Sequence, residues 1–334
     1  MKITAKAPCR VDLAGGTIDI WPLYLYHENA VTVNFAVNRY ASCEIETRAD
    51  ARIRLRSLDL KGEEEFDSIE ALRAAKKYRL PLAAYMVRYF RPETGLDIVT
   101  NSEAPAGAGI SGSSTLIIAL SSALARLTGR KLHIEKIREL SQNIEAQIIR
   151  VPTGCQDYYP AMYGGVSAIE LTEAGIERKA IPIDLEELNR RILLAYTGVP
   201  RNSGINNWEV TKLHIDGDKA VLKNFDRIAA IAHAMRQALE RSDWNDAGRL
   251  LREEWSFRRK NAPGITTPLI DRLVDATRKA GAAGAKVCGA GGGGCVIFLV
   301  QPDAKQRVAD MIRREGAEVL DVQVAPKGVQ VKAS

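Results

Sequence analysis

The sequence predicts an α+β fold of two domains. At 334 residues the chain is long enough to bury two sizeable cores. Most of its first hundred residues have strand patterns, whereas the second half alternates strands with helices. A hydrophobic content of 46% and a charged content of 26% are typical of a soluble globular protein. We place the boundary near residues 185–200 and take 1–190 and 191–334 as the two domains.

The first half is expected to hold mainly strands, followed by helices. Alternating apolar residues predict strands over 2–14, 31–47, 53–58 and 96–100. Helical patterns cover 68–90, 116–127 and 134–148. Gly129 ends the second of these helices, and Pro152 follows the third. A further strand should open after Gly164 and Gly165.

The second half is expected to alternate helices with strands. Helices are predicted over 221–240, 245–260, 268–280 and 304–315. Strands are predicted over 191–196, 285–288, 295–300 and 318–324. A run of glycines, 289–294 with one alanine, separates the two central strands.

Charge and cysteine usage limit the function classes. The formal charge of +6 and the pI near 9.0 favour anionic ligands such as nucleotides. A nucleic-acid surface is not required, because basic and acidic residues are interspersed and aromatics are only 6%. The cysteines are odd in number and form no C-x-x-C pair, which predicts reduced thiols and no zinc site. With no signal-peptide pattern or membrane-spanning run, we expect a cytoplasmic protein.

A stretch rich in glycine and serine, residues 105–115 (PAGAGISGSST), precedes an apolar helix. Glycine lets backbone N–H groups turn inward toward an anion, and the helix start adds unpaired N–H groups and a positive dipole end. The loop therefore predicts a phosphate site, formed by Pro105, Gly107, Gly109, Ser111, Gly112, Ser113 and Ser114. The alternative is an ordinary serine-capped helix after a flexible loop.

The common nucleotide-binding motifs do not account for this loop. It lacks the Gly-Lys-Ser/Thr ending of a Walker A loop. It also lacks the spacing and the acidic residue of a dinucleotide-binding fold. The His-Arg-Asp and Asp-Phe-Gly motifs of protein kinases are absent from the sequence. An ATP site here must be of another kind.

Three stretches in order resemble the motifs of the GHMP kinases, the family of galactokinase, homoserine kinase, mevalonate kinase and phosphomevalonate kinase. They are residues 6–19 (KAPCRVDLAGGTID), 105–115 and 286–294 (KVCGAGGGG). The resemblance implies a fold of two α+β domains, with ATP and the acceptor in the cleft between them. It also implies Mg²⁺, and a glycine loop at 289–294 that packs on the phosphate loop.

The resemblance gives roles to several charged residues. Asp157 matches the carboxylate proposed to act as base or to orient the acceptor hydroxyl, and Arg10 matches an arginine near it. Glu145 matches the Mg²⁺ ligand, with Ser113 or Ser114 as its partner. From the residues alone, the alternatives are a turn former or cap for Asp157, a solvated helix residue for Glu145 and a surface strand-end residue for Arg10. Lys6 is a weaker candidate for the site.

The acceptor residues are expected at Gly16, Thr17, Asp19, Asp157 and Arg201. Asp19 matches the carboxylate with which galactokinases bind sugar hydroxyls, whereas Arg201 and Ser203 match a loop beside the acceptor. Galactokinases carry Glu and His where this chain has Gly16 and Thr17. The missing glutamate should leave space for a bulkier or anionic sugar. The first motif ends here in Gly-Gly-x-x-Asp, which resembles the ending in the heptose 7-phosphate, fucose and uronate kinases of the family.

The sequence thus predicts an ATP-dependent kinase that phosphorylates a sugar at the anomeric hydroxyl. Its partners should be a small-molecule sugar or sugar phosphate, with no nucleic acid and no membrane, and the protein a monomer or homodimer. Two alternatives stay open. One is a mevalonate-type alcohol kinase, and the other is a sensor of sugar or ATP that kept the fold and lost catalysis.

Overall fold

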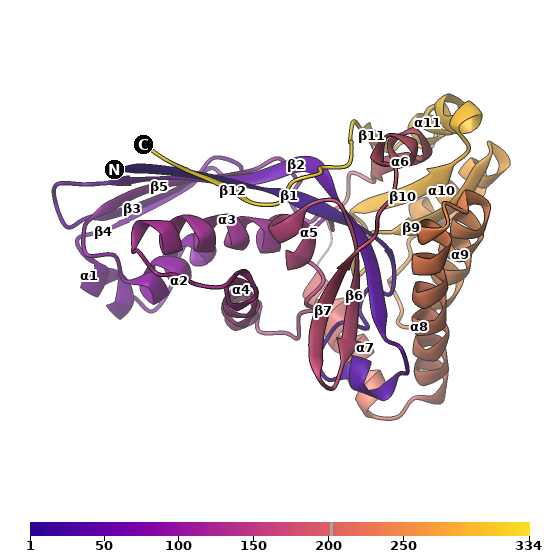
Figure 1. Ribbon diagram of the computed structural model, residues 1–334, viewed down its shortest axis with the longest axis horizontal. Helices are drawn as coiled ribbons and strands as arrows, with labels where there is room; N and C mark the ends of the chain where they lie inside the picture. Colours follow the sequence, from indigo (N-terminus) through magenta and orange to yellow (C-terminus); the bar gives the residue numbers. More distant parts are fainter. Residues whose placement is uncertain (201–202) are drawn as a thin grey trace.

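A long hairpin, made of β1 (Lys2–Ala14) and β2 (Val31–Thr47), runs through the molecule (Figure 1). The computed structural model describes the backbone of residues 1–200 and 203–334, and the side chains outside 201–206. β2 is long enough to pair with two further strands, through residues 41–47 at one end and 31–35 at the other. Both strands are apolar and β-branched enough to stay buried along most of their length.

The hairpin belongs to an eight-stranded sheet of order β12-β1-β2-β5-β3-β4, with β6 pairing β2 and β7. The other strands are β3 (Ile53–Ser57), β4 (Gly62–Phe66), β5 (Leu96–Ser102), β6 (Val166–Thr172), β7 (Gly175–Ala180) and β12 (Gln330–Ala333). All pairs in it are antiparallel except β3 with β5. Because β12 pairs with β1, the two chain termini lie side by side (Figure 1).

Helices cover one face of this sheet (Figure 1). They are α1 (Ile69–Ala74), α2 (Pro81–Phe90), α3 (Gly112–Leu127), α4 (Ile134–Ile149) and α5 (Tyr158–Tyr163). A short 3₁₀ turn, η1 (Leu23–Tyr26), lies apart from them and contacts β6 and α7. α3 is buried almost all round, because it packs against β1, β2, α2 and α4. The start of this helix is thereby held against the centre of the hairpin.

The second half of the chain builds a four-stranded antiparallel sheet of order β11-β8-β10-β9. Its strands are β8 (Ile192–Tyr196), β9 (Ala282–Val287), β10 (Cys295–Val300) and β11 (Glu318–Leu320). Its helices are α6 (Leu185–Arg191), α7 (Ser203–Ile215), α8 (Lys219–Glu240), α9 (Trp244–Arg258), α10 (Pro268–Lys279) and α11 (Lys305–Arg314), with a 3₁₀ turn η2 at Pro302–Ala304.

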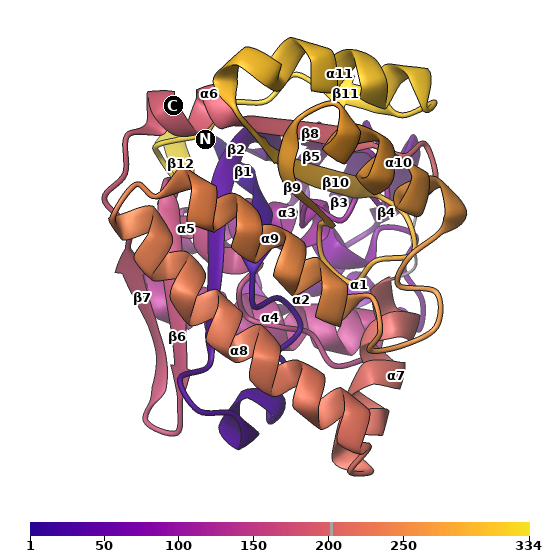
Figure 2. The same cartoon turned by 90° about the vertical axis from the view of Figure 1, so that its right-hand side faces the viewer.

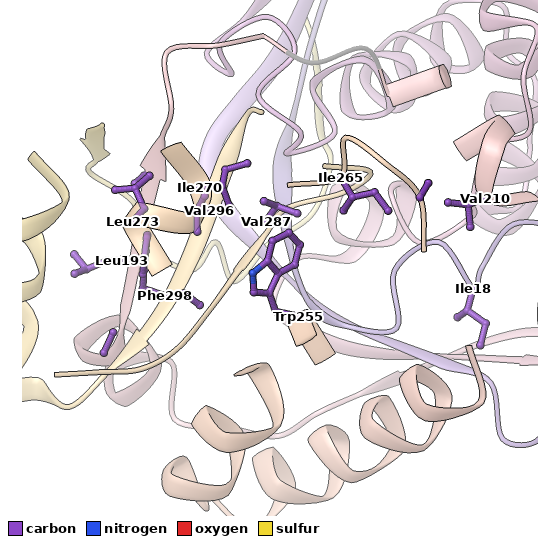
Figure 3. Close-up of a cluster of buried hydrophobic side chains, with 14 of the residues drawn as sticks. Ile18, Leu193, Val210, Trp255, Ile265, Ile270, Leu273, Val287, Val296 and Phe298 are labelled. Carbon is purple, nitrogen blue, oxygen red and sulfur yellow. The ribbon is translucent and has the colours of Figure 1, made fainter. Parts of the chain in front are cut away.

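α8 and α9 lie side by side (Figure 2), and α9 packs against β9. Figure 3 shows the buried Trp255 of α9 directed toward Val287 and Val296. Because α9 also contacts β1, it links the second sheet to the long hairpin. Its C-terminal end reaches the turn that follows β1.

The α+β class is confirmed, with several differences from the predicted elements. The helix expected over 68–90 is two helices, since Pro81 begins a new one and disfavours helical geometry at the residue before it. α3 begins at Gly112, within the glycine-serine loop. Six elements were not predicted, and they are β4, β7, β12, α5, α6 and α7. The first sheet draws on residues 2–180 and 330–333 and the second on 192–320; the domain boundary near residue 190 remains our proposal.

Candidate active site

A cavity of about 350 Å³ lies between the glycine-serine loop, the turn after β1 and the segment before α5. Its charged lining residues in the described part of the chain are Arg10, Asp19, Asp59, Glu145 and Asp157. Asn207, Gly289 and Ala290, from the second half of the chain, close one side. The cavity therefore brings together residues from all three predicted motifs.

The glycine-serine loop has the backbone of an anion site. Gly107, Gly109 and Ser111 have positive φ (67°, 75° and 64°), and their neighbours do not. This alternation turns successive N–H groups toward one point, as in a nest. Ser111 is the residue before α3, yet its side chain makes no capping bond, and its buried hydroxyl has no partner among the described residues. Ser111 is thus not an ordinary serine cap, and the loop has the backbone geometry of an anion site.

The second glycine-rich loop packs directly on the first. Gly294 has a φ of 75°, and a Cβ there would lie 2.6 Å from the carbonyl oxygen of Ala108. The N–H of Cys295 donates to the same oxygen at 2.7 Å. Only glycine allows this close approach. The packing predicted for residues 289–294 is confirmed, and it holds the glycine-serine loop in place.

Arg10 and Asp157 form an ion pair that lines the cavity, with Arg10 buried and Asp157 half-buried. The Nε and Nη2 atoms of Arg10 donate to Asp157 Oδ1 at 2.8 and 2.6 Å, and Nη1 donates to the carbonyl of Gly109 at 3.1 Å. The Arg10 side chain is 3% exposed and that of Asp157 is 25% exposed. Arg10 is therefore not a surface strand-end residue. Asp157 precedes α5 but makes no capping bond to it.

Glu145 is buried on α4 beside the start of α3, so it is not a solvated helix residue. Ser113 Oγ donates to its Oε1 at 2.6 Å, and Tyr158 Oη donates to its Oε2 at 2.7 Å. Burial raises the pKa of Glu145. Ser114, the other predicted partner, is buried and lines the same cavity. The structure thus brings Ser113, Ser114 and Glu145 together.

These groups fit a magnesium ion that is shared with a nucleotide. Within the described part of the chain, no three histidine, cysteine or acidic residues form a group that could hold a metal by themselves. Mg²⁺ is commonly bound by one or two carboxylates together with substrate phosphates. A single buried carboxylate with a hydroxyl beside it, next to an anion-binding loop, has that composition.

Asp19 lies near the ion pair and is almost fully buried. Its Oδ2 accepts a hydrogen bond from the N–H of Gln156 at 2.8 Å. Gly154 allows this contact, because a Cβ there would lie 2.0 Å from the same oxygen. Burial, and then the charge of Asp157, raise the pKa of Asp19 to about 6. This end of the cavity thus carries two carboxylates, Asp19 and Asp157, with different surroundings.

The space expected at Gly16 does not exist. Gly16 is buried and does not line the cavity, and a Cβ there would lie 2.6 Å from Asp12 Oδ2 and 3.0 Å from Arg258 Nη2. The room left by the absent glutamate is occupied by these side chains, so the predicted pocket for a bulkier sugar at this position is wrong. Thr17, by contrast, does line the cavity. Arg201 and the side chain of Ser203 lie outside the described residues.

A buried charge cluster behind the turn was missed by the sequence analysis. Lys286 Nζ donates to Asp12 Oδ2 at 2.5 Å, and the N–H of Gly289 donates to Asp12 Oδ1 at 3.2 Å. Arg258 and Glu254, one turn apart on α9, pair at 2.7 Å. Although burial opposes it, the positive charge of Lys286 holds the pKa of Asp12 well below its usual range. For Asp12 and Lys286 the available signal was a charged residue within an apolar strand, whereas Glu254 and Arg258 lie on a polar helix that gave no such signal.

Two family models match the chain. The GHMP kinases N terminal domain matches residues 73–165, and the GHMP kinases C terminal model matches residues 235–318. Together they span more than half of the chain, and they include the glycine-serine loop, Glu145, Asp157 and the second glycine-rich loop.

Several curated proteins are similar along the whole chain. D-glycero-alpha-D-manno-heptose 7-phosphate kinase of Campylobacter jejuni is 28% identical, covering 98% of both chains. A Bacteroides fragilis L-fucokinase/L-fucose-1-P guanylyltransferase is 25% identical over 99% of this chain, which spans only 38% of that longer protein. A mevalonate kinase of Thermococcus sibiricus is 24% identical, covering 99% of both.

The fold matches those of solved structures. A D-glycero-D-manno-heptose 1-phosphate kinase from Bacteroides thetaiotaomicron superimposes with a TM-score of 0.80, at 23% identity, over 99% of both chains. The element order and the two sheets described above are therefore those of a known fold.

Proposed function

This chain belongs to the GHMP kinase family, and from that premise we propose that it transfers the γ-phosphoryl group of ATP to the anomeric hydroxyl of a sugar. The observation that carries the proposal is the Arg10–Asp157 pair, which faces the same cavity as the anion-binding loop. Phosphoryl transfer needs a positioned carboxylate for the hydroxyl and donors for the phosphates, and both are present.

The residues divide into a phosphate side and an acceptor side. The N–H groups of the glycine-serine loop and of α3 would bind the phosphates of ATP. Leu60, Leu82 and Ile149 line the cavity as apolar groups suited to a nucleotide base. Glu145 with Ser113 or Ser114 would hold Mg²⁺, which when bound neutralises charge on the phosphates.

Asp157 accepts the proton of the attacking hydroxyl in this proposal. Both bonds from Arg10 reach Oδ1, which leaves Oδ2 for the hydroxyl. The fixed charge of Arg10 orients the carboxylate and stabilises negative charge that develops on the transferred group. Asp19 supplies a second carboxylate beside Asp157, suited to hold neighbouring hydroxyls of a sugar.

We propose heptose 7-phosphate as the preferred acceptor. With the space at Gly16 filled, this choice rests on the similarity to the Campylobacter jejuni enzyme. Among the described lining residues Arg10 is the only cation, so a basic group for the distal phosphate has to come from elsewhere. Arg201 is our candidate for it.

A substrate panel tests the acceptor. We expect kcat/KM, measured by ADP release, to be highest for heptose 7-phosphate among that sugar, mannose, fucose, glucuronate, galactose and mevalonate. The product should carry an anomeric phosphate by phosphorus NMR. A preference for mevalonate would favour the alcohol-kinase alternative, and absence of ADP release with every compound would favour the sensor.

Glu145→Gln tests the metal ligand. This change keeps the size of the side chain and removes its charge, so the Mg²⁺ concentration for half-maximal activity should rise by about tenfold. Glu139→Gln is the matched control, because Glu139 lies on the same helix and pairs with Lys136 on the surface. If Mg²⁺ dependence were the same in both variants, Glu145 would be a structural residue only.

A further inference from the structure

The Gly16–Thr17 turn, which follows β1, has a backbone conformation that is unfavourable by itself and has to be stabilised by contacts with other parts of the chain. Thr17 has a φ of 75°, in the left-handed region. This conformation is a genuine outlier for a β-branched residue, and it persists only where the surrounding structure fixes it. Thr17 lines the cavity, and Asp19 lies two residues further on. Whatever fixes Thr17 therefore fixes the start of the segment that carries Asp19, whose carboxylate is also held by the N–H of Gln156.

Arg258 supplies this support from the last turn of α9. Its Nη1 donates to Thr17 Oγ1 at 3.0 Å, and its Nη2 donates to the carbonyl oxygen of Gly16. Its Nε donates to Glu254 Oε1 at 2.7 Å. The planar guanidinium thus donates hydrogen bonds to both the backbone and a side chain of the turn, while the Glu254 carboxylate accepts from its Nε. The residue is 3% exposed.

The guanidinium is itself held rigidly. Glu254 is fully buried, and Lys286 Nζ lies 3.5 Å from its Oε1. Lys286 also binds Asp12, whose Oδ2 lies 4.0 Å from Arg258 Nη2. Asp12 is two residues from Arg10 on β1, and their side chains lie 3.7 Å apart. One buried charge cluster therefore joins α9, β9 and β1 behind the acceptor end of the cavity.

We propose that Arg258 is a positioning residue for the sugar acceptor, which holds the Gly16–Thr17 turn so that Thr17 and Asp19 face the substrate. The inference rests on the proposed function, since it assigns the acceptor to this end of the cavity. Arg258 does not line the cavity among the described residues, so it acts through the turn. Its loss should affect the sugar rather than ATP.

Arg258→Lys is the informative variant. Lysine keeps a positive charge near Glu254 and Asp12, but a single ammonium cannot reproduce the fork to the turn. We expect the KM for the best sugar of the panel to rise by about tenfold, as for loss of one charge-assisted hydrogen bond. The KM for ATP should stay within about twofold. Arg249→Lys is the control on the same helix, where Arg249 pairs with Asp246 and Glu253 at the surface.

A double-variant cycle tests whether the effect passes through Thr17. Thr17→Val removes the hydroxyl that accepts from Arg258, and Thr17→Ser keeps it. Because residues that share one bond are not additive, Arg258→Lys should raise the sugar KM of Thr17→Val by less than it raises that of the wild type, and the remaining rise reports the bond to the Gly16 carbonyl. In the Thr17→Ser background it should have its full effect.

Hydrogen exchange in the free protein gives a readout that needs no substrate. Arg258→Lys should speed exchange of the amides of residues 15–21 and leave residues 105–114 unchanged. Unchanged exchange at 15–21 would overturn the inference, as would sugar and ATP KM values that rise together in step with a loss of Tm. If no sugar on the panel were phosphorylated, the proposed function would fail, and the exchange result would still decide the role of Arg258 in holding the turn.

Discussion

Asp157→Ala should lower kcat by about 10²–10⁴-fold while ATP binding survives, the size expected for loss of a general base. Asp157 is the carboxylate that Arg10 holds in the cavity through two bonds to Oδ1. Its removal takes away the proton acceptor but leaves the anion-binding loop and Glu145 in place. We would measure kcat by ADP release and ATP affinity by calorimetry, with Asp157→Asn as a variant of equal size.

Asp184→Ala is the matched control, because both aspartates stand at the residue before a helix. Asp184 caps α6 by accepting from the N–H groups of Glu186 and Glu187 at 2.9 and 3.3 Å. Its loss should cost about 1 kcal/mol of stability and leave kcat unchanged. The opposite pattern, with Asp157→Ala destabilised and kcat within a few-fold of wild type, would return Asp157 to the role of a cap.

Local patterns predicted the fold class because each sheet is built mainly from strands with clear alternation or long apolar runs. β12 was missed since it is short and largely exposed, and its strand conformation depends on pairing with β1 from the far end of the chain. The pairing of β2 with both β5 and β6 is also invisible in the sequence. Partners separated by many residues are set by tertiary packing, which a local pattern does not contain.

The sequence predicted those parts of the candidate site whose geometry is set by neighbouring residues of one motif. The glycine-serine loop is one of them, since its positive φ values and the start of α3 both arise within the same short stretch of sequence. The error at Gly16 has a different origin. A glycine was interpreted as open space, whereas Arg258, more than two hundred residues away in sequence, fills it. Charged residues inside apolar segments, such as Asp12 and Lys286, were the overlooked signal.

Asp19→Asn should reduce kcat/KM for the sugar by about 10–100-fold, the range for replacing charge-assisted hydrogen bonds by neutral ones. Asparagine has the same size, and its side-chain oxygen can still accept from the N–H of Gln156, which now donates at 2.8 Å. The turn should therefore keep its place, and the KM for ATP should hardly change. Steady-state kinetics with each substrate varied in turn measures both values.

The same substitution should change the pH dependence of activity and of stability. Burial, and then the charge of Asp157, raise the pKa of Asp19 to about 6, so the wild type should lose sugar kcat/KM as the pH falls through 6. A folded-state pKa above the unfolded value of 3.8 means that the folded protein binds the extra proton. Ionisation of Asp19 therefore lowers the free energy of unfolding. The contribution of Asp19 to that free energy should rise as the pH falls from about 6 to 4.

Asp19→Asn should therefore raise Tm at pH 8, and the gain should shrink at pH 5, while sugar kcat/KM loses its acidic limb near pH 6. Asp97→Asn serves as the control, because Asp97 pairs with Arg48 at the surface and lies away from the cavity. It should keep the wild-type limb. If Asp19→Asn kept the wild-type kcat/KM for the sugar, and kcat/KM still fell below pH 6, Asp19 would not belong to the acceptor site. Asp157 would then be the carboxylate that binds the acceptor.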